Sequence, residues 1–222
     1  MLGRGSPLRP GSRMLNRHAR GFFTGLFSPI ARFLLRVGVS PDAVTVVGTV
    51  GVVVGALTLY PMGQLWWGSL VITVFALSDV LDGIMARERG RSGPWGNFLD
   101  STLDRIADGA IFGGVAIWFF TGGANRATAI AALACLVLGM VVSYARAKAE
   151  SLGFYANVGI AERAERLISV LLVTGLTGLG LPPVVLLVTL AVLSLATAVT
   201  VVQRMAAVRQ QALAAVDGGK PA

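Results

Sequence analysis

Long apolar runs separated by short polar junctions dominate the pattern of this sequence. Six segments each contain a continuous apolar stretch close to the ~20 residues that an α-helix needs to cross a bilayer. They cover residues 42–60, 64–89, 96–121, 126–152, 162–179 and 183–207. The chain is 55% hydrophobic, with a mean hydropathy of +0.73. We therefore expect an all-α, polytopic membrane protein whose six transmembrane helices form one domain over residues 41–209.

An amphipathic segment precedes the first of these runs. In residues 20–38, hydrophobic positions such as Phe27 and Ile30 recur at helical spacing, and Arg32 and Arg36 flank them. This pattern predicts a helix that lies in the membrane interface, with a short core helix as the alternative.

The two ends of the chain have a different composition. Residues 1–19 predict a disordered basic tail, in which residues 1–13 are typical of a vector-derived segment. Residues 210–222 predict a flexible C-terminal tail.

The 19 Lys and Arg residues are distributed asymmetrically. The junctions between consecutive apolar segments alternate between short and long. Arg126 is the only charged residue at the three short junctions. By the positive-inside rule, both termini and the long junctions are expected to be cytoplasmic. The net charge of +8 fits this bias and anionic lipids better than nucleic acid, because no aromatic and basic residues interleave.

Common catalytic side chains are scarce. Cys135 is the one cysteine, so no intrachain disulfide can form, and its apolar surroundings favour a buried hydrophobe over a reactive thiol. His18 is the one histidine and lies in the basic tail. Nucleophile activation by His and His-rich metal sites are therefore excluded.

Aspartates within the apolar segments are the main candidates for catalytic or metal-binding side chains. The pattern is Asp79-x-x-Asp82-Gly83-x-x-Ala86-Arg87, eight residues, then Gly96-x-x-x-Asp100-x-x-x-Asp104. Each ionised carboxylate near a bilayer centre costs roughly 2.5–3.5 kcal/mol, so a positive charge must compensate them. Oxygen ligands without Cys or His favour a hard cation such as Mg²⁺, Mn²⁺ or Ca²⁺.

Helical spacing places these carboxylates on two faces. Asp79 and Asp82 are about 60° apart around one helix, and Asp100 and Asp104 are about 40° apart around the next. The short connection near residues 90–95 makes the two helices antiparallel neighbours. The two acidic faces are therefore expected to converge.

This pattern resembles the signature of the CDP-alcohol phosphotransferase family at every defining position, including the eight-residue gap. The resemblance covers residues 28–209. It implies six transmembrane helices, a polar cavity open to the cytoplasm and a pair of divalent metal ions. It also implies a CDP-linked donor that is attacked by an alcohol, with CMP as the leaving group.

By motif position, the resemblance implies Asp79, Asp82, Asp100 and Asp104 as ligands of two Mg²⁺ or Mn²⁺ ions. It also implies Asp104 as the general base on the acceptor hydroxyl, a role that needs no His beside a metal. The implied nucleotide-binding residues are Asp42, Thr45, Asp82, Gly83, Ala86 and Arg87. Helix capping by Ser40 and Pro41 accounts equally well for the residues around Asp42.

A second polar cluster bears on the acceptor. Four basic residues near the ends of the later segments are candidates for binding an acceptor phosphate: Arg146, Lys148, Arg166 and Arg204. A solvated basic rim is the alternative, and we favour it for Arg163, Glu165 and Arg209. Asp108 is a candidate for bonding a hydroxyl of the acceptor.

An acceptor that carries its own phosphate is typical of two branches of the family, which use glycerol phosphate or inositol 1-phosphate. The segments PIARFLLRVGVSPDAVT, LDGIMARERG, SYARAKAES and ERAERLI are similar to the actinobacterial inositol-phosphate branch. This similarity implies transfer of the phosphatidyl group from CDP-diacylglycerol to inositol 1-phosphate in a bacterial plasma membrane.

Three alternatives stay open. Glycerol phosphate as the acceptor would make the chain a phosphatidylglycerophosphate synthase. Buried acids also suit a divalent-cation transporter, although no ionisable residues continue to the far side. A structural scaffold gives no reason for four acids at this spacing. Small residues in the third and fourth segments, together with the family resemblance, lead us to expect a homodimer.

Overall fold

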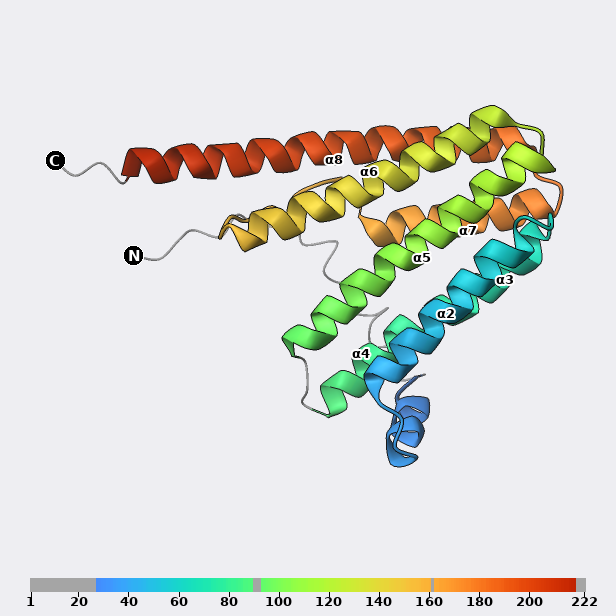
Figure 1. Cartoon of the computed structure of the whole chain (residues 1–222), viewed down its shortest axis with the longest axis horizontal. Helices are drawn as coiled ribbons and strands as arrows, with labels where there is room; N and C mark the ends of the chain where they lie inside the picture. Colours follow the sequence, from blue (N-terminus) through green and yellow to red (C-terminus); the bar gives the residue numbers. More distant parts are fainter. Residues whose placement is uncertain (1–26, 90–92, 161, 219–222) are drawn as a thin grey trace, which may run out of the picture. The chain divides into compact units, whose positions relative to one another are not determined.

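The computed structural model describes residues 27–89, 93–160 and 162–218 (Figure 1). All regular structure in these ranges is helical, which confirms the all-α prediction, while the six membrane spans and the interfacial helix stay predictions. After a helical stretch over residues 27–36, the helices are α2 (Pro41–Leu59), α3 (Leu65–Ala76), α4 (Ser78–Glu88), α5 (Pro94–Thr121), α6 (Arg126–Ser151), α7 (Arg163–Gly178) and α8 (Pro183–Gly218). The first part of the predicted interfacial helix and the predicted tail over residues 1–19 lie outside the described residues.

The chain divides into two compact units. The first contains Met1–Gly48 and Leu77–Asp100, and the second contains Thr49–Ala76 and Ser101–Ala222. Helices α2 and α5 each contribute residues to both units. Each unit has its own buried apolar cluster.

In the first unit, the helix over residues 27–36 packs against α4. Ala31 is buried together with Ile84 and Met85. An ion pair between Arg32 Nε and Glu88 Oε1, 3.0 Å long, joins the same two helices. These contacts hold the helix that carries the first two motif aspartates.

In the second unit, α6 packs against α8, and α7 packs against both α3 and α8. Figure 1 shows α6 and α8 running in the same direction, with α7 running in the opposite one. The core is built from small and branched apolar residues such as Ala132 and Val170. Tyr60 is fully buried within it, and its hydroxyl lies 2.9 Å from Ser69 Oγ.

The helix ends follow local sequence signals. Ser40 Oγ accepts the Ala43 N–H at 3.1 Å and Pro41 is the first helical residue, as expected for the start of α2. Gly153 and Gly180 follow the ends of α6 and α7 with φ of 80° and 108°. Only glycine adopts this conformation without strain, so both helices stop there.

Two boundaries differ from the sequence prediction. The expected helix over residues 64–89 is divided at Leu77, where apolar side chains give way to Ser78 and Asp79. Leu77 itself keeps helical backbone angles, with φ of −65° and ψ of −14°, and no side chain caps α4 there, so the interruption is confined to this residue. At the other end, α8 continues to Gly218 and includes much of the segment expected as a flexible tail. Ala, Gln and Leu in this stretch are strong helix formers.

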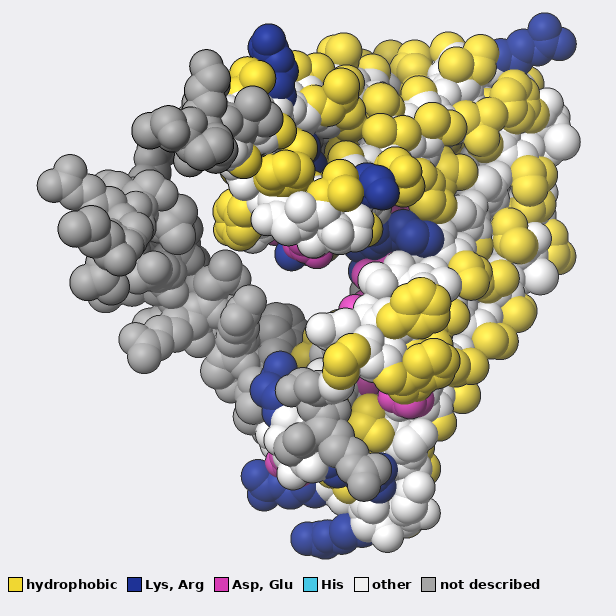
Figure 2. All heavy atoms as spheres, turned by 60° about the vertical axis from the view of Figure 1, so that its left-hand side comes forward, with side chains coloured by type: hydrophobic (Ala, Val, Ile, Leu, Met, Phe, Trp, Pro, Cys, Tyr) yellow, Lys and Arg dark blue, Asp and Glu magenta, His cyan; other side chains and the backbone are white. Residues whose placement is uncertain are grey.

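Four stretches of the described chain are long and apolar enough to cross a membrane: Pro41–Leu59, Leu65–Glu88, Arg126–Ser151 and Pro183–Ala215. Helix α5 carries Asp100 and Asp104 in its first half and Asp108 at its middle, and α7 has only 16 residues. Large hydrophobic residues are exposed along most helices, and Figure 2 shows them over much of one face. The chain is a membrane protein.

Close packing of α5 on α2 in the second unit generates a prediction. A Cβ added at Gly114 would overlap the carbonyl oxygen of Ala56, whereas a Cβ added at Gly113 would meet nothing within 4 Å. We expect Gly114→Ala to lower the free energy of unfolding by about 1–3 kcal/mol. Gly113→Ala is the matched control and should be neutral or slightly stabilising. Thermal melting in detergent measures both, and equal effects would contradict this packing.

Candidate metal centre

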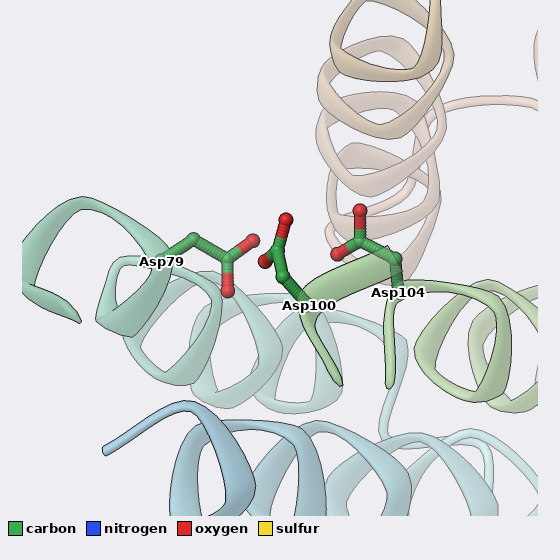
Figure 3. Close-up of side chains that lie close together, drawn as sticks. All are labelled: Asp79, Asp100 and Asp104. Atoms are coloured by element: carbon green, nitrogen blue, oxygen red, sulfur yellow. The ribbon is translucent and has the colours of Figure 1, made fainter. Parts of the chain in front are cut away.

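Three motif aspartates come together. Asp79 on α4 and Asp100 on α5 both belong to the first unit, and Asp104 follows one turn after Asp100 on the unbroken helix α5. One carboxylate oxygen from each lies within 4.8 Å of the others. Figure 3 shows the three side chains close together. Ligand oxygens around one hard divalent cation are separated by at most about 4–5 Å. The donor set therefore fits Mg²⁺ or Mn²⁺, and the expected convergence of the acidic faces is confirmed for these three residues.

Asp82 is not one of these three residues. It is only 9% exposed, and its Oδ2 accepts a hydrogen bond from the Thr45 hydroxyl of α2. The same hydroxyl lies 3.1 Å from the carbonyl oxygen of Pro41. The start of α2 therefore fixes the orientation of the Asp82 carboxylate, and its role as a metal ligand stays a prediction.

The other predicted nucleotide-binding residues lie in the first unit as well. Asp42 accepts a hydrogen bond of 3.0 Å from Trp95 Nε1. Around Gly83, the nearest side-chain atom to an added Cβ would be Arg87 Nη1 at 3.8 Å. Ala86 is half-buried and Arg87 is exposed. The small residues leave the α4 backbone open beside Asp82, as a bound nucleotide would need, and the nucleotide assignment stays a prediction.

In the second unit, Arg163 bridges two aspartates of α5. Its Nη1 lies 2.8 Å from Asp104 Oδ1, and its Nε donates to Asp108 Oδ1 at 3.1 Å. Arg105 Nη2 lies 3.5 Å from the other oxygen of Asp104. Arg163 therefore belongs to the charged network around Asp104, and its assignment to a solvated rim was wrong. Glu165 is exposed and caps α7 by accepting the N–H of Glu162 at 3.0 Å.

A sequence signal for Arg163 exists. Arg163 and Arg166 are three residues apart in ERAER, so they lie about 60° apart around α7. The inference that Arg166 points into the protein therefore applies to Arg163 too. The different predictions for Arg163 and Arg166 did not take this shared face into account.

Arg166 and Asp108 form the buried end of the network. Their Nη2 and Oδ2 atoms are 3.8 Å apart, and the residues are 1% and 4% exposed. Gly139 of α6 makes room for the guanidinium, because a Cβ there would lie 3.0 Å from Nη2. Arg166 Nε has no hydrogen-bond partner among the described residues. Because an unpaired buried charge is costly, Asp108 and Arg166 stabilise one another.

The predicted acceptor-binding residues have different environments. Arg146 and Lys148 are exposed near the end of α6, and Arg146 Nε lies 2.8 Å from Glu150 Oε1. Arg166 and Arg204 are buried. Arg204 also donates to main-chain carbonyls, so part of its hydrogen-bonding capacity is used by the protein itself. Binding of an acceptor phosphate by these four residues stays a prediction.

A family model for CDP-alcohol phosphatidyltransferases matches residues 38–202. The chain belongs to the CDP-alcohol phosphatidyltransferase family. A phosphatidylinositol phosphate synthase of Streptomyces avermitilis is 48% identical over 94% of this chain and 88% of its own length. The enzyme of the same name from Cutibacterium acnes is 50% identical over 87% of this chain and 97% of its own length.

Solved structures agree with this assignment. The Mycobacterium tuberculosis phosphatidylinositol phosphate synthase with CDP-DAG bound superposes with a TM-score of 0.78 and 47% identity, covering 82% of this chain and 92% of that chain. The same enzyme with manganese and citrate gives a TM-score of 0.77 and 47% identity, covering 81% and 87%. The chain is therefore a transferase, and its carboxylate group indicates the use of a divalent metal.

The hydrogen bond between Thr45 and Asp82 generates a prediction about metal affinity. Because it orients a motif carboxylate, we expect Thr45→Val to weaken Mn²⁺ binding about 10-fold. Thr45→Ser retains the hydroxyl and should bind Mn²⁺ like the wild type. Electron paramagnetic resonance titration of the purified protein measures the affinity. Wild-type affinity in Thr45→Val would show that this bond is not needed at the metal centre.

The bridge made by Arg163 generates a prediction about turnover. Arg163→Gln removes the charge that pairs with Asp104 and Asp108, so we expect transferase turnover at saturating substrate to fall about 10-fold or more. Arg163→Lys keeps the charge without the two-nitrogen geometry and should give an intermediate rate. Arg209→Gln, at an exposed position of α8, is the control. If Arg163→Gln turns over like this control, the bridge has no functional role.

Proposed function

We propose that this protein transfers the phosphatidyl group of CDP-diacylglycerol to inositol 1-phosphate and releases CMP. The observation that carries the proposal is the convergence of Asp79, Asp100 and Asp104 on a site that fits a divalent cation. The motif around these residues and the names of the similar enzymes support the same substrates. The product would be phosphatidylinositol phosphate.

The donor binds beside the carboxylates. Two Mg²⁺ or Mn²⁺ ions, when they are bound at the carboxylates, would neutralise the charge of the donor diphosphate and stabilise the attacking and leaving oxygens of an in-line displacement. Asp79, Asp82, Asp100 and Asp104 hold the ions. Asp42, Thr45, Gly83, Ala86 and Arg87 border the nucleotide, with Gly83 and Ala86 leaving the α4 backbone accessible.

The acceptor hydroxyl then attacks the phosphorus that bears the diacylglycerol. The new bond joins the inositol oxygen to this phosphorus, and the bond from phosphorus to the CMP oxygen breaks. Asp104 takes the hydroxyl proton as general base. Arg163, at 2.8 Å from the Asp104 carboxylate, holds that carboxylate in place and ties it to Asp108. Direct transfer suits the site because it needs no covalent nucleophile.

Four basic residues bind the phosphate of the acceptor: Arg146, Lys148, Arg166 and Arg204. The metal ions already compensate the donor phosphates, so a separate set of cations suits an acceptor with its own charge. Arg166 Nε, which has no hydrogen-bond partner among the described residues, supports this role because it leaves a donor for an anion. Asp108 can also accept a hydrogen bond from an inositol hydroxyl.

The membrane topology is part of the proposal. Together with the four long apolar stretches, helices α5 and α7 give six transmembrane helices. They can cross the membrane because their polar residues face protein instead of lipid. The distribution of Lys and Arg supports a cytoplasmic position for the site and for both termini. Small residues on α5 and α6 favour assembly as a homodimer in the plasma membrane.

Release of CMP tests the proposed function. Purified protein with CDP-diacylglycerol, inositol 1-phosphate and Mg²⁺ should release CMP, and removal of the metal by a chelator should stop the reaction. Asp100→Asn should reduce the rate by at least about 100-fold, because it removes a charged ligand from the metal centre. Glu88→Gln, which neutralises another acid near the end of α4, should retain activity within about 2-fold.

Two outcomes would contradict the proposal. Turnover with glycerol 3-phosphate but not with inositol 1-phosphate would assign the chain to phosphatidylglycerophosphate synthesis. Metal flux into liposomes without CMP release from any acceptor would instead support a divalent-cation transporter.

A further inference from the structure

Three side chains of α8 bind the main chain of the connection between α6 and α7. This connection covers residues 152–162, and the three side chains form a stripe that we call the α8 stripe. Its bonds are Ile160 N–H to Thr200 Oγ1 at 3.2 Å, Arg204 Nε to Val158 O at 3.0 Å, Tyr155 N–H to Gln211 Oε1 at 2.8 Å and Gln211 Nε2 to Tyr155 O at 2.7 Å. All of these residues belong to the second unit.

The α8 stripe lies on one face of the helix. At about 100° per residue, Arg204 is about 40° and Gln211 about 20° around the axis from Thr200. The three side chains therefore follow one line along α8, and the connection runs beside this line. Arg204 extends the contact to α6, because its Nη1 donates to the carbonyl oxygen of Val142 at 2.7 Å.

Gln211 makes the most complete of these contacts. Its side-chain amide pairs with both the N–H and the carbonyl of Tyr155, as a neighbouring β-strand would. The same Nε2 also lies 3.0 Å from the carbonyl oxygen of Ala207, which orients the amide. Gln211 lies beyond residue 202, where the match to the family model ends.

The connection has little packing of its own. Among residues 152–160, all of which the structure describes, only Ala156 is buried, and Tyr155 is 64% exposed. Gly159 has φ of 149°, and a Cβ there would overlap Thr200 Cγ2. Hydrogen bonds from α8, together with this close approach, therefore determine where the connection lies.

The connection joins two parts of the proposed acceptor site. Lys148 lies just before it on α6, and Arg163 and Arg166 follow it on α7. The first turn of α7 is fixed by the capping box between Glu162 and Glu165. Displacement of the connection would therefore move the start of α7 and the arginines that contact Asp104 and Asp108.

We propose that Gln211 is a positioning residue, which clamps the connection between α6 and α7 to α8 and thereby holds the basic residues that bind the acceptor phosphate. This inference rests on the proposed function of the site. Gln211 does not contact the substrates. Its effect is on binding of the acceptor and on the part of turnover that depends on Arg163, while binding of the lipid donor is unchanged.

Hydrogen exchange tests the clamp without reference to activity. In Gln211→Ala, the Tyr155 amide loses its acceptor, so exchange in a peptide covering residues 152–160 should become at least about 5-fold faster. Gln210→Ala changes the exposed neighbouring glutamine and is the matched control, with exchange like that of the wild type. Gln211→Glu keeps an acceptor for the Tyr155 N–H but loses the donor, and should give an intermediate rate.

Kinetics of CMP release test the positioning role. Gln211→Ala should raise the KM for inositol 1-phosphate about 5-fold and lower kcat, because Arg163 moves with the connection, while the KM for CDP-diacylglycerol stays within about 2-fold of the wild type. Gln210→Ala should leave all three constants unchanged. Faster exchange with an unchanged acceptor KM would overturn the positioning role, and unchanged exchange would overturn the clamp itself. A wild-type protein inactive with inositol 1-phosphate would refute the proposed function while leaving the exchange result intact.

Discussion

The structure depends on how the negative charges of carboxylates are compensated in an otherwise apolar helical protein. A charge in such surroundings is stable only beside an opposite charge, a metal ion or several hydrogen-bond donors. The aspartates of this chain have a hydrogen-bond donor, arginine partners and a geometry that fits a metal ion. Thr45 binds Asp82, arginines pair with Asp104 and Asp108, and the oxygens of Asp79, Asp100 and Asp104 gather within reach of one cation. The same charges that are costly in a membrane are what makes phosphoryl chemistry possible there.

Helix α5 connects these groups. Along this continuous helix, every fourth residue from 100 to 108 is an aspartate: Asp100, Asp104 and Asp108. These residues therefore form a single acidic stripe. Asp100 lies in the metal-binding group and Asp108 in the arginine network, and Asp104 takes part in both. In the proposed reaction, this stripe links the donor to the acceptor. Arg163 is important because it couples the last two members of the stripe.

Much of this could be predicted from the sequence, because the decisive signals are local. Apolar runs and turn residues predicted the helices, and the spacing of the four aspartates predicted two acidic faces. The sequence did not reveal the contacts of Arg163 or of Gln211. Both depend on which atoms, distant in the sequence, lie next to these side chains in the folded protein. The extension of α8 to Gly218 depends on helix propensities that apolar periodicity alone does not show.

The central claim is that the converging aspartates bind divalent cations. Crystals of the protein grown with Mn²⁺ and measured at the manganese absorption edge test it most directly. The account predicts anomalous density within coordination distance of the carboxylates of Asp79, Asp100 and Asp104. Anomalous density confined to other residues, or its absence at saturating Mn²⁺, would contradict it.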